Sequence, residues 1–239
     1  MNTAKPDYLP KHTSWHQQNT PKQLAESLAA AIAHCLAQAL TQQPRASLAV
    51  SGGRTPTTMF AALSKHAIAW DRVDITLVDE RWVNEASTSS NASLVRQNLL
   101  QNAASAANFI PLYNGAPSNL EGCQSCHQQL TRISRPIDVV VLGMGNDGHT
   151  ASLFPNCPNL AHAMAQVNTS LCAATTAPVA PQQRITLTAQ QIHLSRHKFL
   201  HLVGTDKLAT LQQAMQLRSP SKMPIFAFLQ RPLSIFWSA

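Results

Sequence analysis

Residues 138–155 read DVVVLGMGNDGHTASLFP and carry the clearest structural signal in the chain. A short apolar run that ends in glycines is typical of a buried parallel strand leading into a tight loop. Gly143, Gly145 and Gly148 let the loop backbone take positive φ values and approach a ligand closely. We expect a helix to open at Thr150, Ala151 and Ser152, so that its N-terminus and the glycine turn direct N–H groups at an anion.

Other short apolar runs alternate along the chain with segments of helical periodicity. The expected strands are 48–50, 73–78, 171–174, 185–188 and 199–203, and the expected helices are 24–40, 57–64, 120–133, 206–217 and one after Asn91 that ends near Leu100. This alternation predicts right-handed crossovers and a mostly parallel, Rossmann-like α/β sheet with helices on both faces. No repeat or long linker divides residues 1–239, which predicts one domain, with 1–20 as an irregular arm or an edge strand.

Composition narrows the class of protein. The chain has 239 residues, of which 44% are hydrophobic and 12% are charged, as expected for a compact globular protein. Its five cysteines are too few and odd in number for a disulfide scaffold, which favours a reducing compartment. Residues 1–20 lack a signal peptide's apolar region, and the apolar stretch 28–40 is shorter than the roughly 20 residues of a membrane span. We therefore expect a cytoplasmic protein with no membrane partner.

The net charge of +7 fits an anionic partner. However, Lys and Arg do not form runs, and the aromatic residues do not interleave with basic ones. This pattern argues against nucleic-acid binding, and a small phosphorylated substrate would suit the charge as well.

Residues 51–56, SGGRTP, follow the first strand and form a candidate phosphate loop. The backbone N–H groups around Ser51, Gly52, Gly53, Arg54 and Thr55 could cradle a phosphate at the start of the next helix. The GxxxxGK[ST] spacing of a Walker A loop is absent. An ordinary strand-to-helix turn is the equally weighted alternative.

Charged side chains gather at other element ends. Asp79, Glu80 and Arg81 follow the second strand, where an arginine fork could bind phosphate and an acid could orient sugar hydroxyls. The alternative is an exposed ion pair of little consequence. Arg184 and Lys207 lie at later element boundaries, from which both could reach one phosphate together with the Ser51 loop.

The glycines at 143, 145 and 148 spell GxGxxG, the first part of a dinucleotide fingerprint. That fingerprint also needs an acid about 20 residues later, yet no Asp or Glu occurs between Asp147 and Asp206. This absence argues against a nicotinamide or flavin site. His149 instead lies two residues from Asp147, the arrangement of a general base and its orienting carboxylate. A structural histidine, one of ten in the chain, is the weaker alternative.

Residues 123–127, CQSCH, match the CxxCH pattern of covalent haem attachment and resemble a redox CxxC. They lie inside an expected helix, no signal peptide would export the chain, and no second cysteine pair is present for zinc. We interpret the match as chance and expect no metal and no cofactor, although a redox role of Cys123 and Cys126 stays open.

Taken in order, six segments resemble the 6-phosphogluconolactonase family, which shares its fold with glucosamine-6-phosphate deaminase. These segments are SGGRTP (51–56), VDERWV (78–83), SN (90–91), LGMGNDGHTASLFP (142–155), RITLT (184–188) and GTDK (204–207). The resemblance runs from about Leu24 to Trp237. It implies hydrolysis of 6-phosphoglucono-1,5-lactone in the oxidative pentose phosphate pathway, without a covalent intermediate.

The resemblance also implies roles for individual residues. His149 would activate water, and Asp147 would orient or electrostatically support it. The phosphate would be held by Ser51, Gly52, Gly53, Thr55, Arg184 and Lys207, and the sugar end would be lined by Asp79, Arg54 and Arg81. Gly145 would belong to the substrate site, with N–H groups of the glycine loop at the oxyanion.

Two alternatives to the lactonase remain. A glucosamine-6-phosphate deaminase-like isomerase would carry a glutamate after the histidine, where this chain reads TASLFP. A non-catalytic sugar-phosphate-binding module would keep the phosphate loop and could lose His149. We expect a monomer or a weak homodimer.

Overall fold

The structure, a computed structural model, describes residues 4–167 and 169–239. The strands are β1 (Thr13–Gln17), β2 (Ala46–Val50), β3 (Val73–Leu77), β4 (Asp79–Arg81), β5 (Asn108–Ile110), β6 (Val139–Leu142), β7 (Cys172–Thr176), β8 (Gln183–Leu187), β9 (His197–Val203) and β10 (Leu233–Ser238). The helices are α1 (Pro21–Gln42), α2 (Pro56–Leu63), α3 (Asn91–Asn98), α4 (Asn119–Leu130), α5 (Leu160–Ala163), α6 (Ala189–Leu194), α7 (Asp206–Leu217) and α8 (Ile225–Leu229), with 3₁₀ turns η1 (Trp70–Arg72) and η2 (Asn102–Ala106).

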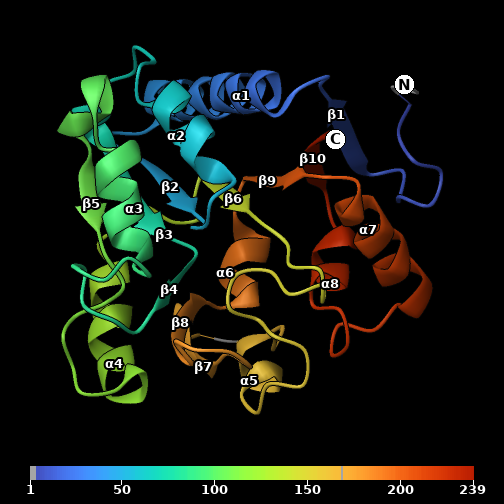
Figure 1. Cartoon of the computed structure of the whole chain (residues 1–239). Helices are drawn as coiled ribbons and strands as arrows, with labels where there is room; N and C mark the ends of the chain where they lie inside the picture. The colour runs from blue at the N-terminus through green and yellow to red at the C-terminus, as the bar shows by residue number, and fades with distance from the viewer. Residues whose placement is uncertain (1–3, 168) are drawn as a thin grey trace.

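Seven strands form a parallel sheet in the order β1-β10-β9-β6-β2-β3-β5. Helix α1 covers one face of this sheet, and α6 and α8 lie on the other (Figure 1). The predicted class, a mostly parallel sheet between helices, is confirmed. The N-terminal residues contribute the edge strand β1, which pairs with the unpredicted strand β10.

Two predicted strands do not join the parallel sheet. Strands β7 and β8 form a separate antiparallel sheet with β4, in the order β4-β8-β7. Only residues 177–182 connect β7 to β8. A connection this short can turn an antiparallel hairpin, whereas parallel neighbours need a crossover of about a dozen residues.

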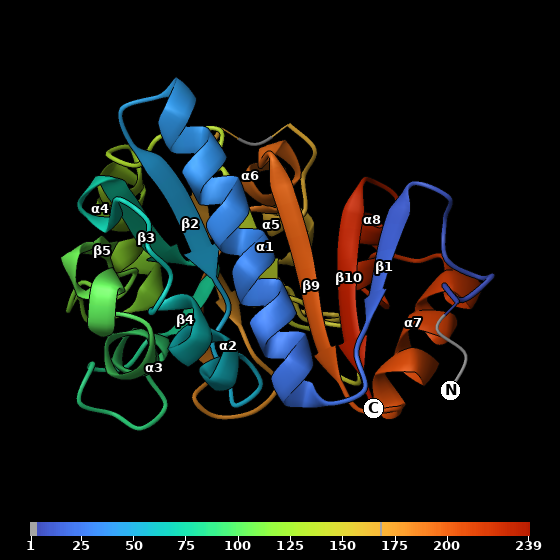
Figure 2. The same cartoon turned by 90° about the horizontal axis from the view of Figure 1, so that it is seen from above.

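Helix α1 is the long helix of the core. The Thr20 side chain caps its first turn, and Pro21 takes the first helical position. Figure 2 shows α1 running diagonally across the sheet between β2 and β9. Four side chains spaced one turn apart are fully buried there: Leu24, Leu28, Ile32 and Leu36.

Among the described helices, α1 alone has the length and apolar character that could suit a membrane span. It is 22 residues long, longer than the apolar stretch 28–40 that was considered from the sequence. Because its apolar side packs against the sheet and α2, α1 is a core helix.

The order of the strands sets the position of the site. After β2 the chain continues to β3 and β5 on one side, and after β6 it continues to β9 and β10 on the other. Neighbouring parallel strands whose connections diverge in this way leave a crevice at their carboxyl ends. The crevice therefore lies between the loops that follow Val50 and Leu142.

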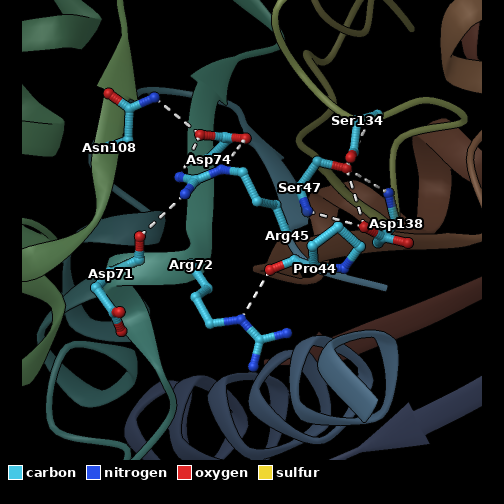
Figure 3. Close-up of polar contacts among 9 residues, drawn as sticks. All are labelled: Pro44, Arg45, Ser47, Asp71, Arg72, Asp74, Asn108, Ser134 and Asp138. Atoms are coloured by element: carbon cyan, nitrogen blue, oxygen red, sulfur yellow. Dashed lines mark hydrogen bonds and ion pairs between the residues drawn. The ribbon is translucent and has the colours of Figure 1, made fainter. Parts of the chain in front are cut away.

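Polar side chains close the opposite, amino-terminal edge of the sheet (Figure 3). The buried Asp138 carboxylate accepts hydrogen bonds from the backbone N–H of Ser47 at 2.8 Å and from its hydroxyl at 3.0 Å. Arg45 binds both carboxylate oxygens of Asp74, at 2.7 and 2.9 Å, and Asn108 donates to the same carboxylate. These contacts tie β2, β3, β5 and β6 together away from the crevice.

The helix expected at Thr150 is absent, and this prediction was wrong. Thr150 and Leu153 form a β-bridge, and Ala151 takes a φ of +52°. The hydroxyl of Thr150 donates to the Gly143 carbonyl at 2.7 Å, while Ser152 donates to Asp79. The Thr150 hydroxyl thus bonds the backbone of its own loop, and local bonds of this kind compete with helix formation. The Ser152 hydroxyl is committed to a distant strand.

We predict that Asp138→Ala destabilises the protein and leaves the KM for its substrate unchanged. The substitution strands the buried N–H of Ser47, and losing a buried carboxylate with several donors costs about 2–4 kcal/mol of unfolding free energy. Urea unfolding with steady-state kinetics checks this, with exposed Glu26→Ala as the control, expected to stay within about 0.5 kcal/mol of the unchanged protein. Equal stability of the two variants would contradict the role of the edge network.

Candidate active site

A cavity of about 240 Å³ lies at the carboxyl ends of β2, β6 and β9. Its size suits a small sugar phosphate better than a dinucleotide. Of the predicted site residues, the cavity wall contains Ser51, Gly52, Gly53, Thr55, Asp79, Arg81, Gly145, His149, Arg184 and Lys207. Arg54 is exposed and outside this wall, and Asp147 lies behind His149.

His149 and Asp147 form the predicted pair. The Nδ1 atom of His149 lies 2.5 Å from Oδ1 of Asp147, which also accepts the backbone N–H of His149 at 3.1 Å. Burial alone would raise the pKa of Asp147, but the bonds and charge of His149 outweigh it, so the pKa is lowered. A carboxylate on Nδ1 holds the proton there and leaves Nε2 as the acceptor.

The absence of a side chain at Gly145 leaves the space that His149 and Asp147 occupy. A Cβ atom on Gly145 would lie 2.2 Å from the His149 ring and 2.6 Å from Asp147 Oδ1. Its N–H donates to the His149 carbonyl at 2.9 Å, and the N–H of Gly148 donates to the Gly145 carbonyl at 3.0 Å. These two N–H groups are therefore occupied and do not support the expected oxyanion contact.

The small sheet brings two arginines to one side of the cavity. Arg81 of β4 is paired directly with Arg184 of β8. Arg184 is only 7% exposed and donates through Nε to the Pro181 carbonyl at 2.7 Å. Among the described residues neither arginine forms an ion pair. Facing like charges are unfavourable, so an anion bound between them would relieve the repulsion.

The pKa of Arg184 reflects this environment. Burial and the charge of Arg81 lower it, while Asp79 and Glu80 act in the opposite direction. An arginine stays charged in proteins even so, because its unperturbed pKa exceeds 12. The cavity wall therefore holds a permanent, partly desolvated positive charge.

The loop after β6 contacts the small sheet directly. Ser152 donates to Oδ2 of Asp79 at 2.6 Å, and Asp79 is 7% exposed. The Phe154 ring lies 4.5 Å from the His149 ring and 5.6 Å from the Arg184 guanidinium carbon. The Phe154 ring thus contacts both the histidine and the arginine.

Glu80 has a role that neither sequence interpretation anticipated. It is fully buried and faces away from the cavity, since strand residues alternate in direction. Its carboxylate accepts the backbone N–H groups of Arg81, Asn91 and Ala92 at 2.7–2.8 Å. Burial raises the pKa of Glu80, and these three N–H donors oppose the rise. The period-two alternation of a strand was the signal that separates Glu80 from Asp79.

The phosphate-loop candidate is shaped by Asn91, which was quoted in the resemblance but given no role. A Cβ atom on Gly52 would lie 1.9 Å from Oδ1 of Asn91. The Asn91 amide donates to the Asp79 carbonyl at 2.9 Å. Gly53 has a φ of +103°, which glycine adopts without strain. The hydroxyl oxygen of Ser51 is buried and has no hydrogen-bond partner among the described residues.

Lys207 approaches the cavity from the start of α7. Its Nζ atom contacts the Asn146 side chain and lies 3.6 Å from Asp206. The turn before it needs a glycine, since Gly204 has a φ of +108°. Arg184, Lys207 and the Ser51 loop thus line one cavity.

The CxxCH segment lies within α4 and contacts β7 and the residue before it. The Cys123 sulfur lies 3.9 Å from that of Cys172 on β7, and Nδ1 of His127 accepts the N–H of Leu171 at 3.2 Å. All five cysteines are free thiols. In residues 4–167 and 169–239 no three potential ligand side chains are grouped to hold a metal ion.

Comparison with known proteins assigns this arrangement to a family. The model of the family described as glucosamine-6-phosphate isomerases/6-phosphogluconolactonase matches residues 19–237. A 6-phosphogluconolactonase of Pseudomonas aeruginosa is 45% identical over 89% of this chain and 90% of its own, and one of Mesorhizobium japonicum is 44% identical over 94% and 95%. The crystal structure of a Shewanella baltica 6-phosphogluconolactonase superposes with a TM-score of 0.93 at 44% identity, covering 97% of this chain and 100% of the other.

We predict that Gly52→Ala destabilises the protein by about 1–3 kcal/mol, because the added methyl group overlaps the buried Asn91 amide. The matched control is Gly143→Ala, whose Cβ would meet nothing within 4 Å. Thermal and urea unfolding of both variants measure the difference. A Gly52→Ala protein as stable as Gly143→Ala would show that Asn91 can move aside at no cost.

Proposed function

The chain belongs to the glucosamine-6-phosphate isomerase/6-phosphogluconolactonase family and its activity is hydrolysis of 6-phosphogluconolactone; we propose that water activated by His149 carries out the reaction. The observation that carries the proposal is the His149–Asp147 pair in a cavity that also holds two arginines without ion-pair partners in residues 4–167 and 169–239. The substrate is 6-phosphoglucono-1,5-lactone, and the product is 6-phosphogluconate.

The base acts through the ring atom that Asp147 leaves free. Nε2 of His149 takes a proton from water while the water oxygen attacks C1 of the lactone. The tetrahedral intermediate collapses with cleavage of the bond from C1 to the ring oxygen, which receives the proton back from His149. A lactone is an activated ester, so this route needs no covalent intermediate on the protein.

The phosphate lies against the cationic side of the cavity in this proposal. Arg184 supplies a buried guanidinium, and Arg81 adds a second charge directly across the strand pair. Lys207 and the loop from Ser51 to Thr55 complete the phosphate site. Holding the phosphate fixes the distant end of the sugar, so that C1 reaches His149. Arg54 lies outside the cavity wall, so this proposal gives it no direct contact with the substrate.

Two features support the lactonase over the alternatives. No acid follows His149 in residues 150–155, where the related deaminases carry a glutamate. Ser152 of this segment instead bonds Asp79, and Phe154 packs on His149. A module that only binds sugar phosphates would have no need of the aligned His149–Asp147 pair.

We also propose that the enzyme acts in the cytoplasm as a monomer or weak homodimer and forms one domain over residues 1–239. Free thiols at all five cysteines support a reducing compartment. One continuous core containing Leu9 and Trp237 supports the single domain.

We predict that His149→Ala lowers kcat by about 10²–10⁴-fold, because proton transfer to a positioned base contributes a factor of that order. The assay generates the lactone with glucose-6-phosphate dehydrogenase and measures the rate at which the lactone disappears. The rate of spontaneous lactone opening in water is subtracted. Calorimetry with 6-phosphogluconate should show binding preserved, since the phosphate contacts remain. The control is His34→Ala, exposed on α1, with unchanged kinetics. Equal rates for His149→Ala and the unchanged enzyme would exclude His149 as the base.

Arg184→Met should raise KM by roughly 10–100-fold and change kcat less, because the lost charge-assisted bonds are made to the non-reacting phosphate. Methionine keeps apolar bulk against Phe154. Exposed Arg132→Met serves as the charge-matched control. An unchanged KM for Arg184→Met, measured in the same lactone assay, would remove Arg184 from the phosphate site.

A further inference from the structure

Two residues of the cavity wall carry buried polar atoms without a hydrogen-bond partner within the described chain. One is Ser51, whose hydroxyl belongs to the proposed phosphate loop. The other is His201, for which both ring nitrogens, Nδ1 and Nε2, are unpartnered. The mechanism proposed above gives His201 no role.

His201 lies near the carboxyl end of β9, the strand that adjoins β6 and its His149 loop. It is 5% exposed and pairs in register with Phe236 of β10. Leu202 and Val203 line the same cavity beside it. Burial lowers the pKa of His201 to about 4, so its ring is neutral near pH 7.

A neutral imidazole has one N–H donor and one nitrogen acceptor. Leaving both unbonded inside a protein is unfavourable, and an unsatisfied buried group in a native structure calls for a specific explanation. A ligand that supplies the missing bonds is one such explanation, because His201 borders the cavity. A hydroxyl group suits a neutral ring best, since it can accept from the N–H or donate to the bare nitrogen.

We propose that His201 is a substrate-binding residue that hydrogen-bonds a hydroxyl group of the sugar-lactone ring. This inference rests on the proposed function and deepens it. The arginines hold the phosphate and His149 addresses C1, whereas His201 recognises the hydroxylated carbons between them. A buried polar group of this kind discriminates against an analogue that lacks its partner hydroxyl.

The other unpartnered polar side-chain atoms of the residues that the structure describes lie outside the wall of this cavity, and one of them supplies a control. His193 of α6 also has an unpartnered ring nitrogen, and burial together with the charges of Arg231 and Lys198 lowers its pKa to about 4. It stacks on Phe228 and does not border the cavity. His193→Phe therefore matches His201→Phe in chemistry and differs in location.

The test compares His201→Phe, His201→Gln and His193→Phe. We expect His201→Phe to lower kcat/KM for 6-phosphoglucono-1,5-lactone by about 10-fold or more, and His193→Phe to leave it within twofold. Glutamine offers one donor group and one acceptor, so His201→Gln should recover part of the loss and also serves if the phenylalanine variant fails to fold. Replacing an unpartnered buried histidine should raise the Tm of both phenylalanine variants by roughly 2–4 °C.

Deoxy lactones distinguish substrate binding by His201 from a purely structural role, because a structural role would not make the effect of His201→Phe depend on a particular substrate hydroxyl. Wild type and His201→Phe are assayed with the 6-phospholactones lacking the hydroxyl at C2, C3 or C4. At one of these three carbons, we expect the loss of kcat/KM from the missing hydroxyl and the loss from His201→Phe to be non-additive. Both changes remove the same hydrogen bond, so the second change costs little once the first is made. Additive losses at all three positions, or a folded His201→Phe with kcat/KM within twofold of wild type, would overturn the inference.

Failure of the underlying function gives a different result. Wild type that does not accelerate lactone opening above the spontaneous rate would overturn the proposed activity. Wild type that is active while His201→Phe is equally active would overturn only the role of His201. Calorimetric binding of 6-phosphogluconate, which keeps the hydroxyl groups, should weaken about 10-fold in His201→Phe and stay unchanged in His193→Phe.

Discussion

The buried carboxylate of Glu80 is the constraint on which the site depends. It accepts three backbone N–H groups, one from its own strand and two from the start of α3. A charge placed in the interior is tolerated only with such donors, so β4 and α3 must keep this relative position. Because strand residues alternate, fixing Glu80 on the inner side fixes Asp79 and Arg81 on the cavity side.

Close packing then sets the remaining spacings. Gly52 touches Asn91, and Gly145 touches the histidine ring and its carboxylate, so neither position has room for a side chain. The glycine-rich sequences at both strand ends therefore serve contacts within the protein as much as the approach of a ligand. The hydrogen bond from Ser152 to Asp79 joins the loop after β6 to strand β4 of the small sheet.

Several charged and polar groups of the cavity wall lack, within the described residues, the partners that such groups normally have inside a protein. Arg81 and Arg184 face each other without an ion-pair partner in the described chain, and Ser51 and His201 keep unbonded polar atoms. Such costs are typical of sites whose missing partner is a substrate. The network at the opposite edge of the sheet, with Asp138 accepting several bonds, belongs to the stabilising part of the fold.

Local patterns in the sequence were enough to predict the α/β class, the glycine loops and the closeness of His149 to Asp147, because each depends on residues near one another in the chain. The sequence offered Arg184 and Lys207 as candidates for one site but could not show that they lie together. Sequence also suggested a helix at Thr150 that does not form, since Thr150 bonds back to Gly143 of its own loop and Ser152 bonds the distant Asp79. Only the tertiary structure decided the separate antiparallel sheet, the burial of Glu80, the pairing of Arg81 with Arg184 and the place of His201. The pairing of β4 with β8 and the place of His201 depend on contacts between segments far apart in the chain, whose register no local periodicity specifies. The burial of Glu80 depends on the packing of the start of α3 against β4.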